Sequence, residues 1–203
     1  MFKTIQIGIV MLACAFVAAA QSSDYRKYEF YAGYSFGQVV NGIGDASLPD
    51  DPQDYSGLNT SITRNIARYA GLKFDFSVTE KIPYATRPSG LNVDSDFYNF
   101  SVGLQIKDNS SDKLVKPFLH ALMGVAHIRN RISIGTDACI ASRPCPTVFT
   151  ERETGIASIV GGGIDIRAGD RIDVRVIQVD YIPTRLFDSS KRNVRVGIGL
   201  AFH

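Results

Sequence analysis

Tryptophan is absent from this 203-residue chain, and cysteine, histidine and methionine occur only three times each. Apart from the N-terminus, no apolar run reaches about 18 residues, which excludes a bundle of membrane-spanning helices. The scarcity of sulfur and imidazole groups leaves no metal-ligand signature, so we expect neither metal nor cofactor. A net charge of +2 without a basic stripe argues against nucleic-acid binding. The length predicts a single domain.

The first 20 residues have the pattern of an export signal. A lysine precedes an apolar core over 5–17, and three alanines follow that core. This pattern predicts cleavage between Ala20 and Gln21, leaving residues 21–203 as the exported domain. Cys14 leaves open a lipoprotein interpretation, although the three residues before it form a poor lipobox.

Two cysteines, Cys139 and Cys145, remain after removal of that signal, and both lie in a polar stretch. In an exported protein an even number of cysteines predicts a disulfide. Zinc requires about four ligands, and His127 is the only other nearby candidate, so a zinc site is not expected. We therefore predict a small disulfide-closed loop.

The rest of the chain consists of short segments in which apolar and small or polar residues alternate with a period of two. Such alternation predicts strands with one apolar face. In the first segment an apolar row contains Tyr28, Phe30 and Tyr34, and the opposite row begins with Glu29. Most segments have about 10 residues, the length that a tilted strand needs to cross a membrane. The segments are 28–37, 57–66, 70–78, 97–106, 117–127, 154–168, 172–181 and 193–202.

The connections between these segments alternate in length, and each odd-numbered connection is longer than the turn that follows it. This is typical of an up-and-down barrel with long loops outside the cell and short periplasmic turns. We therefore predict an all-β fold, an eight-stranded antiparallel up-and-down transmembrane β-barrel. The connections are 38–56, 67–69, 79–96, 107–116, 128–153, 169–171 and 182–192.

The sixth and seventh segments predict a hairpin with a defined register. A three-residue turn over 169–171 places Arg167 opposite Asp173 and Asp165 opposite Arg175. Both cross-strand pairs then join opposite charges, which favours this register.

Further along the seventh segment, Gln178 and Asp180 have the wrong parity for the inward face. A β-bulge near Ile177 would return both side chains to the interior. Without a bulge, the two residues would lie beyond the apolar band.

Parity places a set of charges inside the barrel. An eight-stranded barrel is only just wide enough for its side chains to fill. The interior is then either a salt-bridged plug or a narrow path for ions and small solutes. The matched charges favour the plug, because unpaired buried charges are costly. The predicted lumen charges are Glu29, Asp75, Asp165, Asp173 and Asp180 against Lys73, Arg167, Arg175 and Arg195.

The opposite arrangement, with the apolar row inside, would give a soluble ligand-binding barrel. Charges and glycines in the predicted lumen row favour the membrane arrangement, as do outward aromatic residues near strand ends. These aromatic residues are Tyr28, Phe36, Tyr98 and Phe202. The C-terminal pattern also favours it: Arg195, Gly197, Leu200 and Phe202 have the spacing of the strand signal read by the outer-membrane assembly machinery, although His203 follows.

Four segments, 29–36, 116–124, 161–167 and 175–184, together with this C-terminal pattern, resemble the outer-membrane protein A-like family of small porin-type barrels. The resemblance covers nearly all of residues 21–203. It implies integral location in a bacterial outer membrane as a monomer, with outer-membrane lipid and the export and assembly machinery as partners. The peptidoglycan-binding domain of larger relatives has no counterpart, so we expect no cell-wall anchoring. The family predicts biochemical role poorly.

No catalytic constellation stands out, and we expect no enzyme activity. The expected role is structural or interactive, through an extracellular ligand on the long loops 38–56 and 128–153, with limited diffusion through the lumen. One alternative is a lipid A-modifying enzyme, in which His127 would activate a hydroxyl with Ser133 and with Glu151 or Glu153 nearby. We expect His120 to be interior and hydrogen-bonded.

Overall fold

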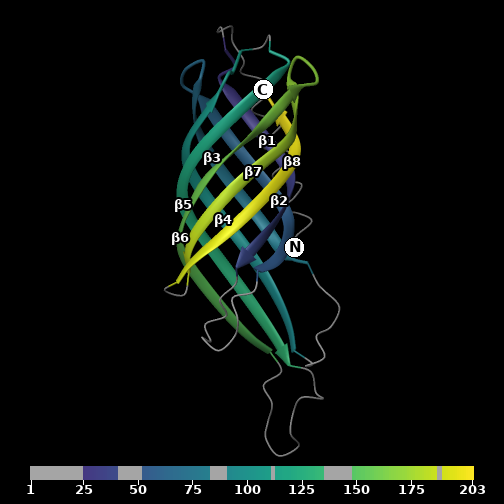
Figure 1. The fold of residues 1–203 in the computed structure, drawn as a ribbon, viewed down its shortest axis with the longest axis vertical. Coiled ribbons are helices and arrows are strands. Elements are labelled where there is room, and N and C mark those ends of the chain that lie inside the picture. The colour runs from purple at the N-terminus through teal and green to yellow at the C-terminus, as the bar shows by residue number, and fades with distance from the viewer. Residues whose placement is uncertain (1–24, 41–51, 83–90, 111–112, 135–147, 187–188) are drawn as a thin grey trace, which may run out of the picture.

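The computed structural model describes residues 25–40, 52–82, 91–110, 113–134, 148–186 and 189–203. In these ranges the chain forms a closed antiparallel barrel in which each strand pairs with the next and the last pairs with the first. This confirms the predicted eight-stranded fold. Figure 1 shows the closure, with the yellow final strand alongside the purple first strand. The strands are β1 (Tyr28–Val40), β2 (Pro52–Asn65), β3 (Ala70–Lys81), β4 (Leu91–Lys107), β5 (Val115–Ile134), β6 (Val148–Arg167), β7 (Ile172–Leu186) and β8 (Ser189–Phe202).

The barrel has two unlike ends. We call the end with the connections 66–69 and 168–171 the turn end; the C-terminus also lies there, at the top of Figure 1. We call the opposite end, where β1, β3 and β5 finish, the loop end. β1 and β8 pair in antiparallel fashion, with Phe30 opposite Phe202 and Gln38 opposite Val194. β1 therefore begins at the turn end, where β8 finishes. The cleavage site at Ala20 and Gln21 lies outside the described residues and stays a prediction.

Every predicted strand is present, but several are longer than predicted. β5 and β6 have 20 residues each, whereas a tilted strand crosses a membrane with roughly 9–11. Most of the extra residues lie at the loop end, where outward positions such as Asp94 and Arg131 are exposed and inward positions such as Ser95 and Asn130 are buried. The alternation of buried and exposed residues therefore continues to the ends of these strands, but the outward residues there are polar. A prediction based on apolar rows ends each strand where its outward row becomes polar, which is too early.

The predicted loop over 182–192 is wrong. β7 continues to Leu186 and β8 resumes at Ser189. In this stretch Ile182 and Leu186 are buried, so the apolar row has moved to the inside of the barrel. In the middle of β7 the apolar residues point outward, but from Ile182 onward they point inward. This change of face broke the alternation pattern, so the end of the strand was not recognised in the sequence.

The predicted hairpin of β6 and β7 has the expected register, with Arg167 opposite Asp173 and Asp165 opposite Arg175. The ladder between β7 and β8 is interrupted after Arg175 and resumes at Gln178, which lies opposite Gly197 of β8. Val176 and Ile177 both point outward there, with 41% of each exposed. This β-bulge near Ile177 is one of the two arrangements that the sequence left open, and it returns the following polar residues to the interior.

The outer face of the barrel is apolar, and the inner face carries the charges. Met123, Leu119 and Ile156 are 68%, 66% and 65% exposed, and comparable side chains occur on all eight strands. In contrast, Arg175 and Lys73 are fully buried. A soluble protein has the opposite distribution. The described part of the chain contains no helix of sufficient length and apolar character to span a membrane.

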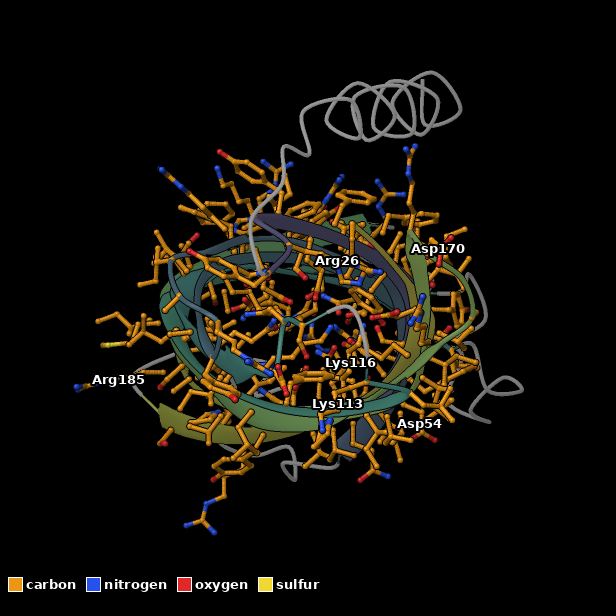
Figure 2. The ribbon with its side chains drawn as sticks, turned by 90° about the horizontal axis from the view of Figure 1, so that it is seen from above. Arg26, Asp54, Lys113, Lys116, Asp170 and Arg185 are labelled. Carbon is orange, nitrogen blue, oxygen red and sulfur yellow. The ribbon has the colours of Figure 1, made fainter. Side chains whose placement is uncertain are left out.

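The lumen is filled in two layers. The layer nearer the turn end holds the clustered charged side chains. The layer nearer the loop end holds two apolar clusters together with buried polar side chains such as Asn130 and Lys191. The apolar layer contains one cluster of Leu122, Ile159 and Ile182 and a larger cluster of Val39, Tyr55, Phe97, Ala126, Ile128, Ala157 and Leu186. Figure 2 looks along the barrel and shows side chains filling the interior, with Lys116 pointing inward.

Candidate functional site

The charged layer begins with a cluster around Lys107 at the turn end. The ammonium nitrogen of Lys107 lies 2.6 Å from a carboxylate oxygen of Glu29 and 2.6 Å from one of Asp165. Arg175 donates to the same two carboxylates, to Asp165 at 2.7 Å and to Glu29 at 3.1 Å. These four side chains are at most 1% exposed. Strands β1, β4, β6 and β7 thus contribute one side chain each to a buried, charge-balanced cluster.

Asp173 anchors the rim of this cluster. Its carboxylate accepts from Lys116 at 2.8 Å and from His203 Nε2 at 2.8 Å, and Arg26 lies 3.9 Å away. Burial lowers the pKa of the His203 imidazole, even though its hydrogen bond to Asp173 acts in the opposite direction. The residue after the final strand is therefore part of the lumen structure.

A second cluster lies deeper, around Asp180. Arg195 donates to Asp180 at 2.6 Å and to Asp75 at 3.1 Å. His120 Nε2 lies 2.9 Å from Asp180, and its Nδ1 lies 3.4 Å from the ammonium of Lys73. Because an ammonium group can only donate, Nδ1 accepts and Nε2 donates to Asp180. His120 is thus interior and hydrogen-bonded, as predicted.

Gln178 joins the two clusters. Its side-chain oxygen accepts from Arg175 at 2.9 Å, and its amide nitrogen donates to Asp180 at 2.7 Å. The β-bulge in β7 places Gln178 on the inward face, so the bulge creates this link. The two clusters form one network through the charged layer.

Two aromatic rings pack against the guanidinium of Arg175. The guanidinium carbon lies 4.1 Å from the centre of the Tyr31 ring and 4.1 Å from that of Phe118. The rings need space that glycines provide: a Cβ on Gly33 would lie 2.0 Å from the Tyr31 hydroxyl, and one on Gly163 would lie 2.8 Å from Phe118. Cation–π contacts of this kind add to the ion pairs of a buried arginine.

The structure places every predicted lumen charge in this network except Arg167. Arg167 is the last residue of β6, and its guanidinium turns toward the connection to pair with Asp170 at 2.8 Å. The expectation of a lumen role for Arg167 is therefore wrong, because the strand ends before its side chain is enclosed.

Sequence reasoning missed Lys107 and Lys116. Both lie one residue outside the predicted segments 97–106 and 117–127, yet both continue the inward parity of their strands. Among the described residues, the two ion clusters then hold five buried carboxylates and five buried lysine or arginine cations, with the partly exposed Arg26 at the rim. The carboxylates are Glu29, Asp75, Asp165, Asp173 and Asp180, and the cations are Lys73, Lys107, Lys116, Arg175 and Arg195.

The rim at the loop end contains the histidine of the enzyme alternative. His127 faces outward, and its Nδ1 lies 2.7 Å from the Thr154 hydroxyl. Glu151 and Glu153 alternate with outward-facing Arg152 and Thr154 along β6, so they belong to the inward row. His127 and the two glutamates named in the enzyme alternative therefore belong to opposite faces of the barrel wall.

Other predicted features remain untested. The side chain of Ser133 and both cysteines, Cys139 and Cys145, lie outside the described side chains, so the disulfide stays a prediction. Within the described ranges no group of three or more histidine, cysteine, aspartate or glutamate side chains could hold a metal ion.

The residues of the proposed assembly signal divide between the two faces of β8. Arg195 belongs to the buried network, whereas Leu200 is 41% exposed on the outer face. Phe202 packs near Phe30 of β1, with ring centres 6.4 Å apart, and Gly197 lies opposite Ser35. Recognition of this C-terminal pattern by the outer-membrane assembly machinery stays a prediction.

No protein-family model matches the sequence, and no curated protein matches it. Solved structures do match. Ail, the attachment invasion locus protein of Yersinia pestis, is 17% identical over 86% of this chain and 97% of Ail, with a TM-score of 0.56. Neisserial surface protein A is 12% identical over 89% of this chain and 99% of its own, with a TM-score of 0.57. OprG from Pseudomonas aeruginosa is 11% identical over 86% and 94%, with a TM-score of 0.50. The chain therefore has the fold of the small eight-stranded outer-membrane barrels.

Proposed function

We propose that this chain is an integral, monomeric protein of a bacterial outer membrane that acts as a surface-interaction protein with a closed lumen. Residues 1–20 direct export and are removed, and residues 21–203 form the barrel. The outer-membrane assembly machinery inserts it, and the pattern from Arg195 to Phe202 is its recognition signal. Neither a metal nor a cofactor takes part.

The reversed polarity of the barrel carries this proposal. Burying an aliphatic side chain such as Leu119, Met123 or Ile156 contributes roughly 1.5–3 kcal/mol, and here these side chains are about two-thirds exposed. An apolar belt on all eight strands far exceeds the patches that soluble monomers tolerate. A lipid environment supplies the missing burial. The soluble ligand-binding alternative requires an apolar, accessible interior, whereas one half of this interior is charged and both halves are filled by side chains.

The filled lumen supports a closed barrel. Ten matched charges block the turn-end half, and the apolar layer around Leu122, Ile159 and Ile182 fills the other half. Ion pairs of this geometry are costly to separate within a low-dielectric interior. Diffusion of solutes is therefore a minor activity of this protein.

The loop end supports an interactive role. β5 and β6 are about twice as long as a membrane crossing requires, so their outer halves stand beyond the lipid. A rigid barrel that raises its strands above the membrane can present an extracellular binding surface. One neighbour in fold, Ail, carries attachment in its name and has been crystallised with the heparin analogue sucrose octasulfate. For the present chain we propose an extracellular ligand at the same end.

Enzyme activity is not part of the proposal. A nucleophile needs a base, and the base needs a group that orients it. His127 and Thr154 provide the contact between a base and a hydroxyl. The two glutamates near Thr154, Glu151 and Glu153, could not orient the imidazole because they belong to the opposite face of β6.

Fractionation of a Gram-negative host that produces the full chain tests the proposed location. We expect the protein in the outer-membrane fraction, resistant to carbonate extraction, with a gel mobility that shifts on heating. Met123→Arg places a charge in the apolar belt and should cost about 2–4 kcal/mol, reducing the folded fraction. Thr150→Arg, beyond the belt, is the matched control and should insert normally. Recovery of the unaltered chain from the periplasm would refute membrane insertion.

A further inference from the structure

Charged residues on the outward face of the loop end are sorted by strand. Among the described residues, the outward acidic side chains at this level occur on β2, β3 and β4, and the outward basic ones on β5 to β8. The acidic arc consists of Asp54, Glu80, Asp94 and Asp96. The basic arc consists of Arg129, Arg131, Arg152, Arg185 and Arg192. One side of the rim is thus negative and the other positive.

Within the basic arc, like charges lie next to each other. Arg129 is directly opposite Arg152 in the ladder of β5 and β6. Arg185 pairs with Ser190, which makes Arg192 its diagonal neighbour on β8. Like charges at such positions destabilise a sheet unless an anion lies between them.

The buried charges of this barrel are paired, but the described part of the chain offers the basic arc no ion pair. Two outward carboxylates lie at the edge of the arc, where Asp96 is opposite Arg129 and Asp94 is opposite Arg131. Glu151 and Glu153, which flank Arg152 along β6, belong to the inward row. Among the described residues, no carboxylate lies opposite Arg185 or Arg192 in the ladders that join β6, β7 and β8. The arc therefore has an excess of positive charge that the described chain does not neutralise.

The arc lies at the edge of the apolar belt. Arg185 is directly opposite Ile156, which is 65% exposed, and Arg192 is two positions from the outward Val194, which is 44% exposed. The arginines therefore stand where lipid hydrocarbon gives way to headgroups. Figure 2 shows Arg185 extending sideways away from the wall, with Asp54 on the other side of the barrel. Side chains that point sideways at this height face neighbouring lipids rather than the space above the barrel.

We propose that the basic arc binds the phosphate groups of an anionic lipid in the outer leaflet, on the β5–β8 side only. Guanidinium groups bind phosphate through paired hydrogen bonds, and arginines from adjacent strands can share one headgroup. The acidic arc repels the same lipid from β2–β4. The barrel thereby acquires a preferred lipid neighbour on one side. This inference rests on the proposed membrane insertion.

Native mass spectrometry of the detergent-extracted full chain with bisphosphorylated lipid A as the probe tests the proposal. We expect a bound lipid on the unaltered chain. Each basic side chain near an anionic surface contributes a factor of about five, so Arg152→Gln/Arg185→Gln/Arg192→Gln should weaken binding on the order of 100-fold. Lys27→Gln/Arg64→Gln/Arg171→Gln removes three exposed cations at the turn end and is the matched control; it should retain binding.

Two further probes identify the ligand. Dephosphorylated lipid A should bind as weakly to the unaltered chain as bisphosphorylated lipid A binds to the triple variant. Sucrose octasulfate, a soluble polyanion, should not compete at concentrations that leave the lipid in excess. Equal binding of both lipids, equal binding by both triple variants, or displacement by the soluble polyanion would each overturn the proposal. Heat-shifted mobility of every variant is measured in parallel, so a failure to fold into the membrane is distinguished from a loss of lipid binding.

Discussion

The guanidinium of Arg175 packs against the ring of Tyr31, with 4.1 Å between the guanidinium carbon and the ring centre. The two residues come from β7 and β1, which are not neighbours in the barrel wall, so their contact crosses the lumen. The same guanidinium pairs with Glu29 and Asp165. Arg175 therefore ties together strands that the backbone ladder does not connect directly.

Loss of this arginine should strongly destabilise the barrel. Arg175→Gln leaves two buried carboxylates with Lys107 as their remaining cation and should lower the free energy of unfolding by about 3–5 kcal/mol. Urea unfolding in lipid vesicles, followed by heat-shifted gel mobility, measures the change. Arg167→Gln is the control: its partner Asp170 is exposed, so the effect should stay within about 0.5 kcal/mol. Equal stability of the two variants would contradict the role assigned to Arg175.

Gly33 leaves room for the ring of Tyr31, so a side chain at this position should destabilise the barrel. In Gly33→Ala, the added methyl group would lie 2.0 Å from the Tyr31 hydroxyl and 2.4 Å from the carbonyl oxygen of Ile198. Because a backbone atom cannot move aside easily, we expect a loss of about 1–3 kcal/mol by the same urea assay. A Cβ at Gly169 meets nothing within 4 Å, so Gly169→Ala should leave stability nearly unchanged. A tolerated Gly33→Ala would show that Tyr31 does not require this space.

The two lumen layers predict a silent barrel in a planar bilayer. With the charged layer paired and the apolar layer filled by side chains such as Leu122 and Ile159, the folded chain should give no discrete conductance steps. A large porin in the same bilayer is the positive control, and heat-shifted mobility confirms folding. Discrete steps from the folded chain would show an open path and make the lumen charges candidates for ion selectivity.

The enzyme alternative is tested at His127. We expect His127→Ala to leave the lipid A of a producing strain unchanged, because the imidazole is hydrogen-bonded to Thr154 and both glutamates of the enzyme alternative belong to the inward row of β6. Mass spectrometry of lipid A from strains with the unaltered chain, with His127→Ala and with no chain makes the comparison. A lipid modification present only with the unaltered chain would establish catalysis and contradict the proposal.

Local alternation was sufficient to predict the middle of each strand, and the opposite charges on the sixth and seventh segments gave the hairpin register. Alternation gave the β-bulge before Gln178 as one of two alternatives. These features depend on neighbours in sequence or on one adjacent strand. The partners of Lys107 and Lys116 depend instead on which strands face each other across the closed barrel. Parity shows which side chains point inward but not which of them meet. Extending the inward parity by one residue in each direction would have identified both lysines. The apolar lumen at Ile182 could not be recognised, because alternation does not say which row points inward.

Closure of the barrel is what completes the buried ion pairs. Glu29 reaches Lys107 and Arg175 across 78 and 146 residues of sequence, and Asp75 reaches Arg195 across 120. An open sheet would hold these groups far apart, so the pairing energy becomes available only when β1 and β8 join. Partly assembled forms should therefore be poorly populated, and zipping of the β1–β8 seam should be an all-or-none step.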